Sequence, residues 1–178
     1  AELSAAGFRK VETLVTFEAA VGDLPDGAGL PGIEIRDAGT GDIEACRALA
    51  VSVLRLNRFH TDLHLPDAAA DAMRAAWIEN AIRGRAEQVI LACRDGAVLG
   101  FNAVVTRGDA LVIDLIAVAA EAQGQGVGRA LVTAMKRDNS AMRIRVGTQA
   151  GNTASLAFYK RLGFRETDRQ DTWHWTPG

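Results

Sequence analysis

Three glycines occupy alternate positions, Gly124, Gly126 and Gly128, directly before a helix-like pattern that runs to about Arg137. Glycine destabilises a helix start, so its repeated use there needs a reason. Glycine lets an anion come close to the backbone, and the unpaired N–H groups and dipole of a helix N-terminus attract negative charge. The stretch therefore predicts a phosphate or diphosphate site.

The spacing distinguishes between three phosphate-binding motifs. A P-loop requires a Lys-Ser or Lys-Thr pair, and the chain has neither. A dinucleotide fingerprint requires G-x-G-x-x-G after the first parallel strand, but Arg129 follows Gly128 and the preceding strand is the third arm of a meander. The third motif, Gln/Arg-x-x-Gly-x-Gly/Ala, fits the run from Gln123 to Gly128.

This third motif resembles the pyrophosphate loop of the GNAT acetyltransferase superfamily. A second stretch, NTASLAFYKRLGF from Asn152 to Phe164, resembles the GNAT segment in which an Asn opens a helix and FYxxxGF closes it. The resemblance covers about residues 33–176. It implies the GNAT fold, acetyl-CoA as cosubstrate, no metal, and direct acetyl transfer to a primary amine.

The resemblance also implies how acetyl-CoA binds. Backbone N–H groups of the glycine loop hold the diphosphate, with the Gln123 side chain as a further partner. The pantetheine arm adds to the strand edge at Ile116–Val118, and the Ile116 N–H holds the thioester oxygen as charge develops on it. The residues expected to contact the cosubstrate are Ile116, Ala117, Val118, Gln123, Gly124, Gln125, Gly126, Val127, Gly128, Arg129, Asn152, Ser155 and Tyr159.

Tyr159 is the only tyrosine of the chain and stands where the GNAT motif has its general acid. A tyrosine pKa near 10 and a thiol pKa near 8.5 make proton transfer to the CoA thiolate feasible. The alternative for Tyr159 is a core aromatic on the helix face. Asn152 precedes the helix and is a natural N-cap.

Asp114 interrupts the apolar strand LVIDLIAV, and a carboxylate there needs a partner or a function. Strand alternation predicts that Asp114 shares a face with Ile116 and Val118. It is the first candidate for the general base or for holding the substrate ammonium. An ion pair with Arg143 or Arg145 on the neighbouring strand is the alternative.

The irregular stretch RFHTDLHLP is where the acceptor docks in GNAT folds. Its His60 is a second candidate base because histidine titrates near neutral pH; a solvated loop histidine is the alternative. Arg58, Arg83 and Arg85 are candidates for contact with a nucleotide diphosphate, against the alternative of solvated surface arginines.

The elements that must position these groups form a mixed α/β fold. After a strand near Ile33, a helix capped by Thr40 or Asp42 is expected, and then a second helix from Pro66 to Gly84. Three strands follow as an antiparallel meander, with an Asp95-Gly96 hairpin turn. The glycine-rich helix, the strand RIRVGT, the helix from Thr153 and a final strand near DTWHW complete a βαβ crossover with helices flanking the sheet.

Residues 1–22 end in a strand-like run and repeat the Gly-Phe-Arg-strand pattern that also follows the last helix. They are interpreted as a possible remnant of an N-terminal GNAT-like half, with chance as the alternative. Residues 23–32 are predicted as a linker and 33–178 as the acetyltransferase domain. The stretches WIENAIRG and VGTQAGNTASLAFYKRLGF resemble the nucleotide-sugar branch of the superfamily, that of the dTDP-fucosamine acetyltransferases, which implies a nucleotide-linked amino sugar as the acceptor.

Composition narrows the function classes. A net charge of −2 and a pI of about 5.9 argue against nucleic-acid binding, and no apolar run has the length of a membrane span. A cytoplasmic location is expected, with Cys46 and Cys93 as buried free thiols; a homodimer is left open. His60 and His64 have the i, i+4 spacing of the zinc ligands in helical metalloprotease motifs. Such a motif has its general-base Glu directly after the first His, and this chain has Thr61 there. A non-catalytic acetyl-CoA-binding module and other amine acceptors (peptides, proteins, polyamines, aminoglycosides) remain alternatives.

Overall fold

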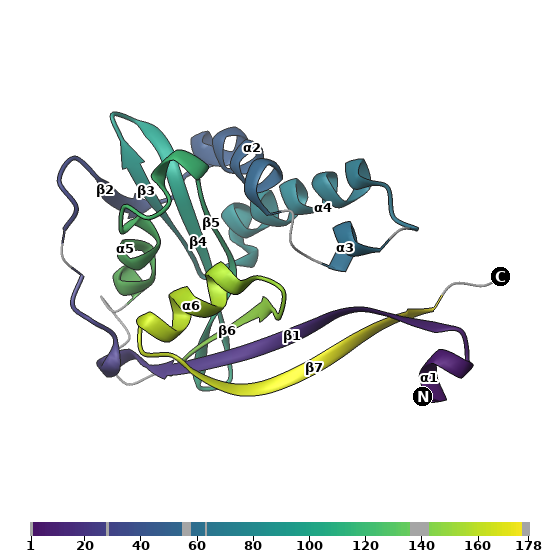
Figure 1. The fold of residues 1–178 in the computed structure, drawn as a ribbon. Coiled ribbons are helices and arrows are strands. Elements are labelled where there is room, and N and C mark those ends of the chain that lie inside the picture. The colour runs from purple at the N-terminus through teal and green to yellow at the C-terminus, as the bar shows by residue number, and fades with distance from the viewer. Residues whose placement is uncertain (1, 28, 55–57, 63, 136–142, 176–178) are drawn as a thin grey trace.

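Seven segments with strand character join into one mixed sheet, and helices cover both of its faces (Figure 1). The computed structural model describes residues 2–27, 29–54, 58–62, 64–135 and 143–175. The strands are β1 (Phe8–Ala20), β2 (Glu34–Asp37), β3 (Gln88–Arg94), β4 (Ala97–Arg107), β5 (Ala110–Val118), β6 (Arg143–Gln149) and β7 (Arg165–Trp175). The α-helices are α1 (Glu2–Ala5), α2 (Ile43–Val53), α3 (Arg58–Thr61), α4 (Asp67–Asn80), α5 (Val127–Thr133) and α6 (Thr153–Arg161).

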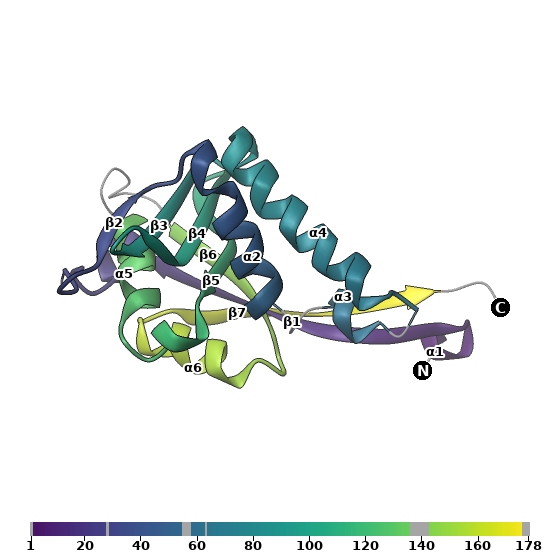
Figure 2. The ribbon, with the colours of Figure 1, turned by 90° about the horizontal axis from the view of Figure 1, so that it is seen from above.

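The sheet order is β2-β3-β4-β5-β6-β1-β7. Figure 2 shows α2 and α4 on one face of the sheet and α5 and α6 on the other. A π-helical turn, η3 (Ala81–Arg85), extends α4 to the predicted end of that helix. The predicted extension of α5 to Arg137 lies outside the described residues. The mixed sheet with flanking helices confirms the predicted fold class.

The antiparallel meander from β3 to β5 has the predicted hairpin turn. Asp95 and Gly96 both have positive φ, 50° and 81°, as a two-residue turn matched to strand twist requires. Asp42, by contrast, makes no side-chain bond to cap α2. Its carboxylate accepts from the Gly39 N–H at 2.8 Å and from the Arg36 guanidinium at 2.7 and 2.8 Å. Asp42 therefore occupies the predicted N-cap position of α2, but its side chain does not supply the capping bond.

The two central parallel strands, β5 and β6, pair over only part of their length. Their register runs from Ala110 opposite Arg143 to Ile113 opposite Val146, whereas β5 continues to Val118. The β4–β5 register shifts at the same point, so that Asp114 is the extra residue of a β-bulge. A bulge bends its strand, and β5 and β6 accordingly separate beyond it. This separation leaves free the edge of β5 at Ile116–Val118, to which the resemblance assigns the pantetheine arm.

The N-terminal strand β1 is an inner strand of this sheet. It pairs antiparallel with β6 on one side and with β7 on the other. Its Val15 and Phe17 side chains are fully buried on the core. Residues 8–20, interpreted from the sequence as the end of a preceding half, therefore complete the same sheet. Their origin in such a half stays a prediction.

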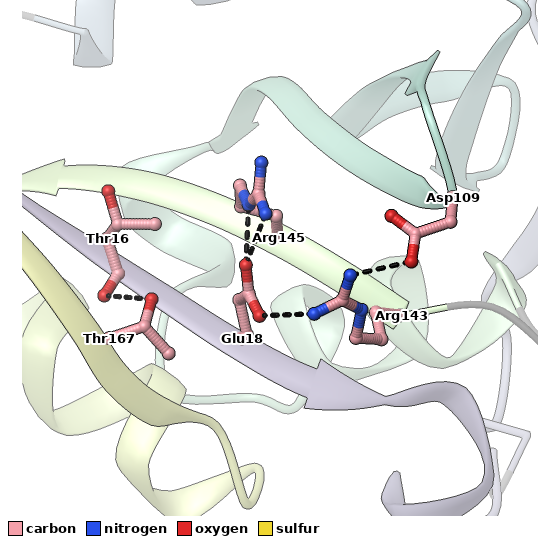
Figure 3. Close-up of polar contacts among 6 residues, drawn as sticks. All are labelled: Thr16, Glu18, Asp109, Arg143, Arg145 and Thr167. Carbon is pink, nitrogen blue, oxygen red and sulfur yellow. Dashed lines mark hydrogen bonds and ion pairs between the residues drawn. The ribbon is translucent and has the colours of Figure 1, made fainter.

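Ion pairs tie β6 to β1 on one side and to the turn between β4 and β5 on the other (Figure 3). Glu18 accepts from the Arg145 guanidinium at 2.6 Å and from Arg143 at 3.4 Å. Arg143 also donates to Asp109 at 2.6 Å. Exposed pairs of this kind stabilise little, but they show which carboxylates these two arginines contact.

Both cysteines are buried free thiols, as predicted. Cys46 has no exposed surface, and its burial raises the pKa of its thiol to about 12. Across the described part of the chain, no helix has the length and apolar character needed to cross a membrane.

We predict that Phe17→Ala destabilises the protein by about 3–5 kcal/mol, because it removes a fully buried ring from the core. Chemical denaturation at neutral pH measures the free energy of unfolding. Lys10→Ala on the same strand is the control: Lys10 is 45% exposed in its pair with Asp171, so less than about 1 kcal/mol is expected. Equal losses in both variants would contradict the inner position of β1.

Candidate functional site

The glycine loop adopts a backbone that requires glycine at two positions. Gly124 and Gly126 have φ of 75° and 86°, in the left-handed region. The first bond of α5 runs from the Ala130 N–H to the Gly126 carbonyl oxygen at 3.0 Å. The N–H groups of the first helical residues, Val127 to Arg129, come before that bond and point out of the helix end. The loop thus presents donors where the sequence predicts a diphosphate.

Gly128 is required for a different reason. A Cβ at this position would lie 3.3 Å from two ring carbons of Phe158 on α6. The missing side chain lets α6 pack closely on the first turn of α5. The prediction that all three glycines serve the approach of an anion is therefore incomplete, because Gly128 also makes room for a packing contact within the protein.

Three side chains of the glycine loop donate hydrogen bonds to backbone carbonyl oxygens of neighbouring segments. Gln123 donates to the Val118 carbonyl oxygen at 3.0 Å, and Gln125 donates to that of Glu121 at 2.6 Å. Arg129 donates to the carbonyl oxygen of Asp26 at 3.1 Å, in the segment predicted as a linker. The Gln123 side chain therefore joins the glycine loop to the last residue of β5.

The edge of β5 that faces the gap toward β6 carries the backbone groups of Ile116 and Val118. The Ala119 N–H donates to the Leu99 carbonyl oxygen at 2.8 Å, toward β4. Because N–H groups alternate between the two edges of a strand, the Ala117 N–H also points toward β4. The N–H groups of Ile116 and Val118 then point into the gap, where the resemblance expects the thioester oxygen and the pantetheine amides.

Asn152 caps α6 as predicted: its Oδ1 accepts from the Ser155 N–H at 3.1 Å. Tyr159 on the same helix is 3% exposed and packs against three phenylalanines. Its ring centroid lies 5.0 Å from Phe158, 5.4 Å from Phe164 and 6.0 Å from Phe17 of β1. Burial raises the pKa of the Tyr159 hydroxyl. The residue is thus a core aromatic that keeps its proton at neutral pH, as a general acid must.

Asp114 does not lie where strand alternation predicts. Asn102 is opposite Ile116 and donates to the Leu131 carbonyl oxygen of α5 at 3.3 Å, which places Ile116 on the α5 face. The Asp114 carboxylate instead accepts from Trp77 Nε1 of α4, at 2.8 Å, on the opposite face. The prediction of a shared face was wrong because the bulge at Asp114 interrupts the alternation.

The arginine partner of Asp114 also differs from the prediction. Arg85 of η3 donates to Oδ2 of Asp114, whose side chain is 8% exposed. Arg143 and Arg145, the predicted partners, contact Glu18 instead. Sequence reasoning missed the joint role of Trp77 and Arg85. A signal was present: a lone carboxylate in an apolar strand needs donors, and a Trp and an Arg stand near the end of the helix preceding the meander.

His60 lies on α3 and its ring is 7% exposed, with Nε2 2.9 Å from Asp71 Oδ1 of α4. The alternative of a solvated loop histidine was therefore wrong. The side chain of Arg58 lies outside what the structure describes, and Arg83 pairs with Glu79 at 2.9 Å. Within the residues placed by the structure, no three His, Cys, Asp or Glu side chains gather in a metal-binding arrangement.

The segment that carries His60 is anchored by Asp62. This carboxylate is 4% exposed and contacts His174 Nδ1 of β7 at 2.5 Å and Arg9 Nη2 of β1 at 3.0 Å. It also accepts from the His64 N–H at 3.1 Å. These donors, with His174 first, hold the pKa of Asp62 well below its usual range. These contacts fix the segment that follows α3 to β1 and β7.

Comparison with known proteins agrees with this geometry. The acetyltransferase (GNAT) family profile matches residues 53–164. The spore coat polysaccharide biosynthesis protein SpsD of Bacillus subtilis is 29% identical over 83% of this chain and 52% of its own length. The dTDP-fucosamine acetyltransferase of Escherichia coli is 32% identical over 88% of this chain and 67% of its own length. The chain thus spans between half and two thirds of these relatives.

A solved structure shows the same fold. The PaiA N-acetyltransferase of Thermoplasma acidophilum, in complex with coenzyme A, superposes with a TM-score of 0.64 at 17% identity, over 79% of this chain and 96% of its own. The chain belongs to the acetyltransferase (GNAT) family. That membership confirms the resemblance inferred from the two motifs.

We predict that Gly126→Ala destabilises the protein by about 1–2 kcal/mol, because an alanine at a φ of 86° is strained and its Cβ would lie 3.3 Å from Leu30. Chemical denaturation measures the loss. Gly151→Ala is the control, since no heavy atom lies within 4 Å of a Cβ there, and a change below about 1 kcal/mol is expected. A neutral Gly126→Ala would contradict the left-handed backbone.

We predict that Asp62→Asn lowers the free energy of unfolding at pH 7. In acid, the free energy of unfolding should decrease less steeply with falling pH in the variant than in the wild type. The folded-state pKa of Asp62 lies below its unfolded value. Its contribution is therefore present above about pH 4 and is lost as the pH drops further. Unfolding measured from pH 7 to pH 2 tests this, with the exposed Asp168→Asn as control. A fall in acid that stays as steep in Asp62→Asn as in the wild type would contradict it.

Proposed function

We propose that this protein is an acetyl-CoA-dependent N-acetyltransferase that acts on the primary amine of a nucleotide-linked amino sugar. The observation that carries the proposal is the gap between β5 and β6, which opens at Asp114 and ends at the glycine loop. One wall of the gap offers inward N–H groups on β5, and its end offers the N–H groups of a helix start. An extended molecule with amides along its arm and a diphosphate at one end suits both features.

The residues present fit acetyl-CoA, which supplies the acetyl group as a reactive thioester. The N–H groups of Val127, Gly128 and Arg129 would hold the diphosphate, where the helix dipole also favours negative charge. The free edge of β5 would bind the pantetheine amides as a neighbouring strand does. Gln123 would hold the diphosphate-binding loop at a fixed position relative to the edge of β5, because its side chain links the two segments.

Acyl transfer then needs three events at this edge. The amine nitrogen attacks the thioester carbon, a C–N bond forms, and the Ile116 N–H donates to the oxygen that gains negative charge. The C–S bond breaks and the electron pair leaves with sulfur. Tyr159 gives its proton to that thiolate. The amine gives one proton to the candidate base His60, and Tyr159 regains a proton from water after CoA leaves. The Tyr159 hydroxyl is protonated at neutral pH, but burial raises its pKa and so opposes the transfer. The transfer therefore requires the sulfur of the bound cosubstrate within hydrogen-bond distance of this hydroxyl.

Asp114 is reassigned in this proposal. A carboxylate held by Trp77 and Arg85 on the α4 face is poorly suited to take a proton from the amine. His60, next to Asp71, remains the candidate base on the acceptor side. Its anchored loop, with Arg58 at the start of α3, supports the prediction that acceptor contacts come from this segment.

The acceptor class is supported by the relatives. One is named for polysaccharide biosynthesis and one for the acetylation of dTDP-fucosamine, at 29% and 32% identity. A small-molecule acceptor and a cytoplasmic location, where acetyl-CoA is available, accord with this proposal. A peptide or protein amine, another small amine, or a non-catalytic acetyl-CoA-binding role are the alternatives that the first experiment separates.

We predict that Tyr159→Phe lowers kcat by about 10²- to 10⁴-fold, because it removes only the acid proton and keeps the buried ring. The KM for acetyl-CoA should change little. CoA-thiol release is measured with dTDP-4-amino sugars, polyamines, aminoglycosides and peptides as acceptors. A purely structural Tyr159 would leave kcat unchanged in the variant.

The acceptor panel tests the other half of the proposal. Turnover confined to the amino-sugar nucleotides supports it, and turnover with another amine replaces the acceptor but keeps the acetyltransferase. Absence of turnover, with acetyl-CoA still raising the melting temperature, would favour the binding-module alternative.

A further inference from the structure

An open pocket of about 310 Å³ lies on the α4 side of the bulge in β5. Its lining is Met73, Ala76, Trp77, Asn80 and Arg85. The first four recur along one face of α4, at the spacing that places helix side chains together. Arg85 is the only charged residue among the five. The pocket thus combines an apolar and aromatic wall with one fixed cation.

Arg85 is held in place before any ligand arrives. It donates to Oδ2 of the nearly buried Asp114, and Trp77 Nε1 donates to the same oxygen at 2.8 Å. Its guanidinium carbon also lies 5.4 Å from the centroid of the Trp77 ring. A guanidinium has several N–H donors in a rigid plane, and the contact with Asp114 uses the donor side at Nη2. A restrained arginine loses less entropy when its other donors bind an anion.

A second guanidinium flanks the same indole. The Arg74 guanidinium carbon lies 5.1 Å from the Trp77 ring centroid. An anion with a flat or apolar part attached suits such a surface: oxygens pair with the guanidinium, and the remainder packs on Trp77 and Met73.

The pocket is adjacent to the gap between β5 and β6. Asp114 is the bulge residue at which these strands separate, and Ile116, the proposed thioester contact, follows two residues later, about 7 Å along the strand. The pocket lies on the α4 face, whereas the glycine loop leads into α5 on the opposite face (Figure 2). An acceptor in the pocket and a cosubstrate in the gap would therefore meet from opposite faces of the sheet.

We propose that Arg85, positioned by Asp114 and Trp77, binds the diphosphate of a nucleotide-linked acceptor and makes the enzyme selective for that acceptor over the free amino sugar. This inference rests on the proposed function, because it concerns the acceptor side of the same site. It assigns Asp114 the role of a positioning residue, in place of the general base expected from the sequence.

Binding of thymidine diphosphate tests the proposal without any acetyl transfer. Titration calorimetry compares the wild type, Arg85→Gln and Arg169→Gln. Arg85→Gln should weaken thymidine diphosphate binding by about 10- to 100-fold, the expected loss for hydrogen bonds to a charged group. Arg169→Gln is the control, because Arg169 lies on β7 and pairs with Glu166; its binding should equal that of the wild type. Binding of thymidine alone should not change in either variant.

A second variant guards against a folding defect. Arg85→Gln leaves Asp114 without its cation, so the double variant Asp114→Asn/Arg85→Gln removes both charges together. It should melt close to the wild type and still bind thymidine diphosphate weakly. Wild-type protein that does not bind thymidine diphosphate would overturn the proposal, and so would unchanged binding in Arg85→Gln or an equal loss of thymidine binding.

Kinetics separate this proposal from the proposed function. For a nucleotide-linked amino sugar, Arg85→Gln should raise KM with little change in kcat, and for the methyl glycoside of the same sugar both constants should stay as in the wild type. Equal losses for the two acceptors would overturn the role of Arg85. If neither sugar is acetylated while thymidine diphosphate binding still depends on Arg85, the proposed reaction fails and the anion site stands.

Discussion

The separation of β5 from β6 after the pair Ile113–Val146 is the constraint on which the site depends. Two parallel strands with full pairing would leave no free backbone donors inside the sheet. The single extra residue at Asp114 bends β5 and exposes its edge. The same bulge turns the Asp114 side chain toward α4, where Trp77 and Arg85 meet it. One local irregularity thus determines both the gap proposed for the cosubstrate and the position of Arg85 in the pocket proposed for the acceptor.

The N-terminal strand β1 supports the other wall of the gap. It pairs along β6, and its Phe17 ring packs against Tyr159, so a residue early in the chain helps to hold the proposed acid. Gly128 plays the corresponding part on the other side of α6, by admitting the Phe158 ring against α5. The helix that carries Tyr159 is therefore fixed between β1 and the glycine loop, which is the rigidity that a proton donor requires.

Local signals were sufficient for much of the fold. The Asp95-Gly96 turn, the cap at Asn152 and the strands of the meander depend on residues close in sequence, and each was predicted from them. The two motifs also identified the family. The same local reasoning found the N-cap position of Asp42 but not the partner of its carboxylate, which binds Arg36 instead of capping α2. The alternative of a solvated loop His60 was wrong, because this ring is buried against Asp71. Neither partner could be chosen without the tertiary structure.

By itself, the sequence determined the order of the strands and of the longer helices, the glycine loop and the helix of Tyr159, since turn geometry, alternation and motif spacing are local properties of a chain. It did not predict the short helices α1 and α3. Only the tertiary structure decided that β1 lies between β6 and β7, and that Asp114 pairs with Arg85 rather than with Arg143 or Arg145. Strand order depends on which edges are free once the whole sheet assembles. The direction of the Asp114 side chain depends on a register shift between two strands, and a register is a relation between segments that no single segment encodes.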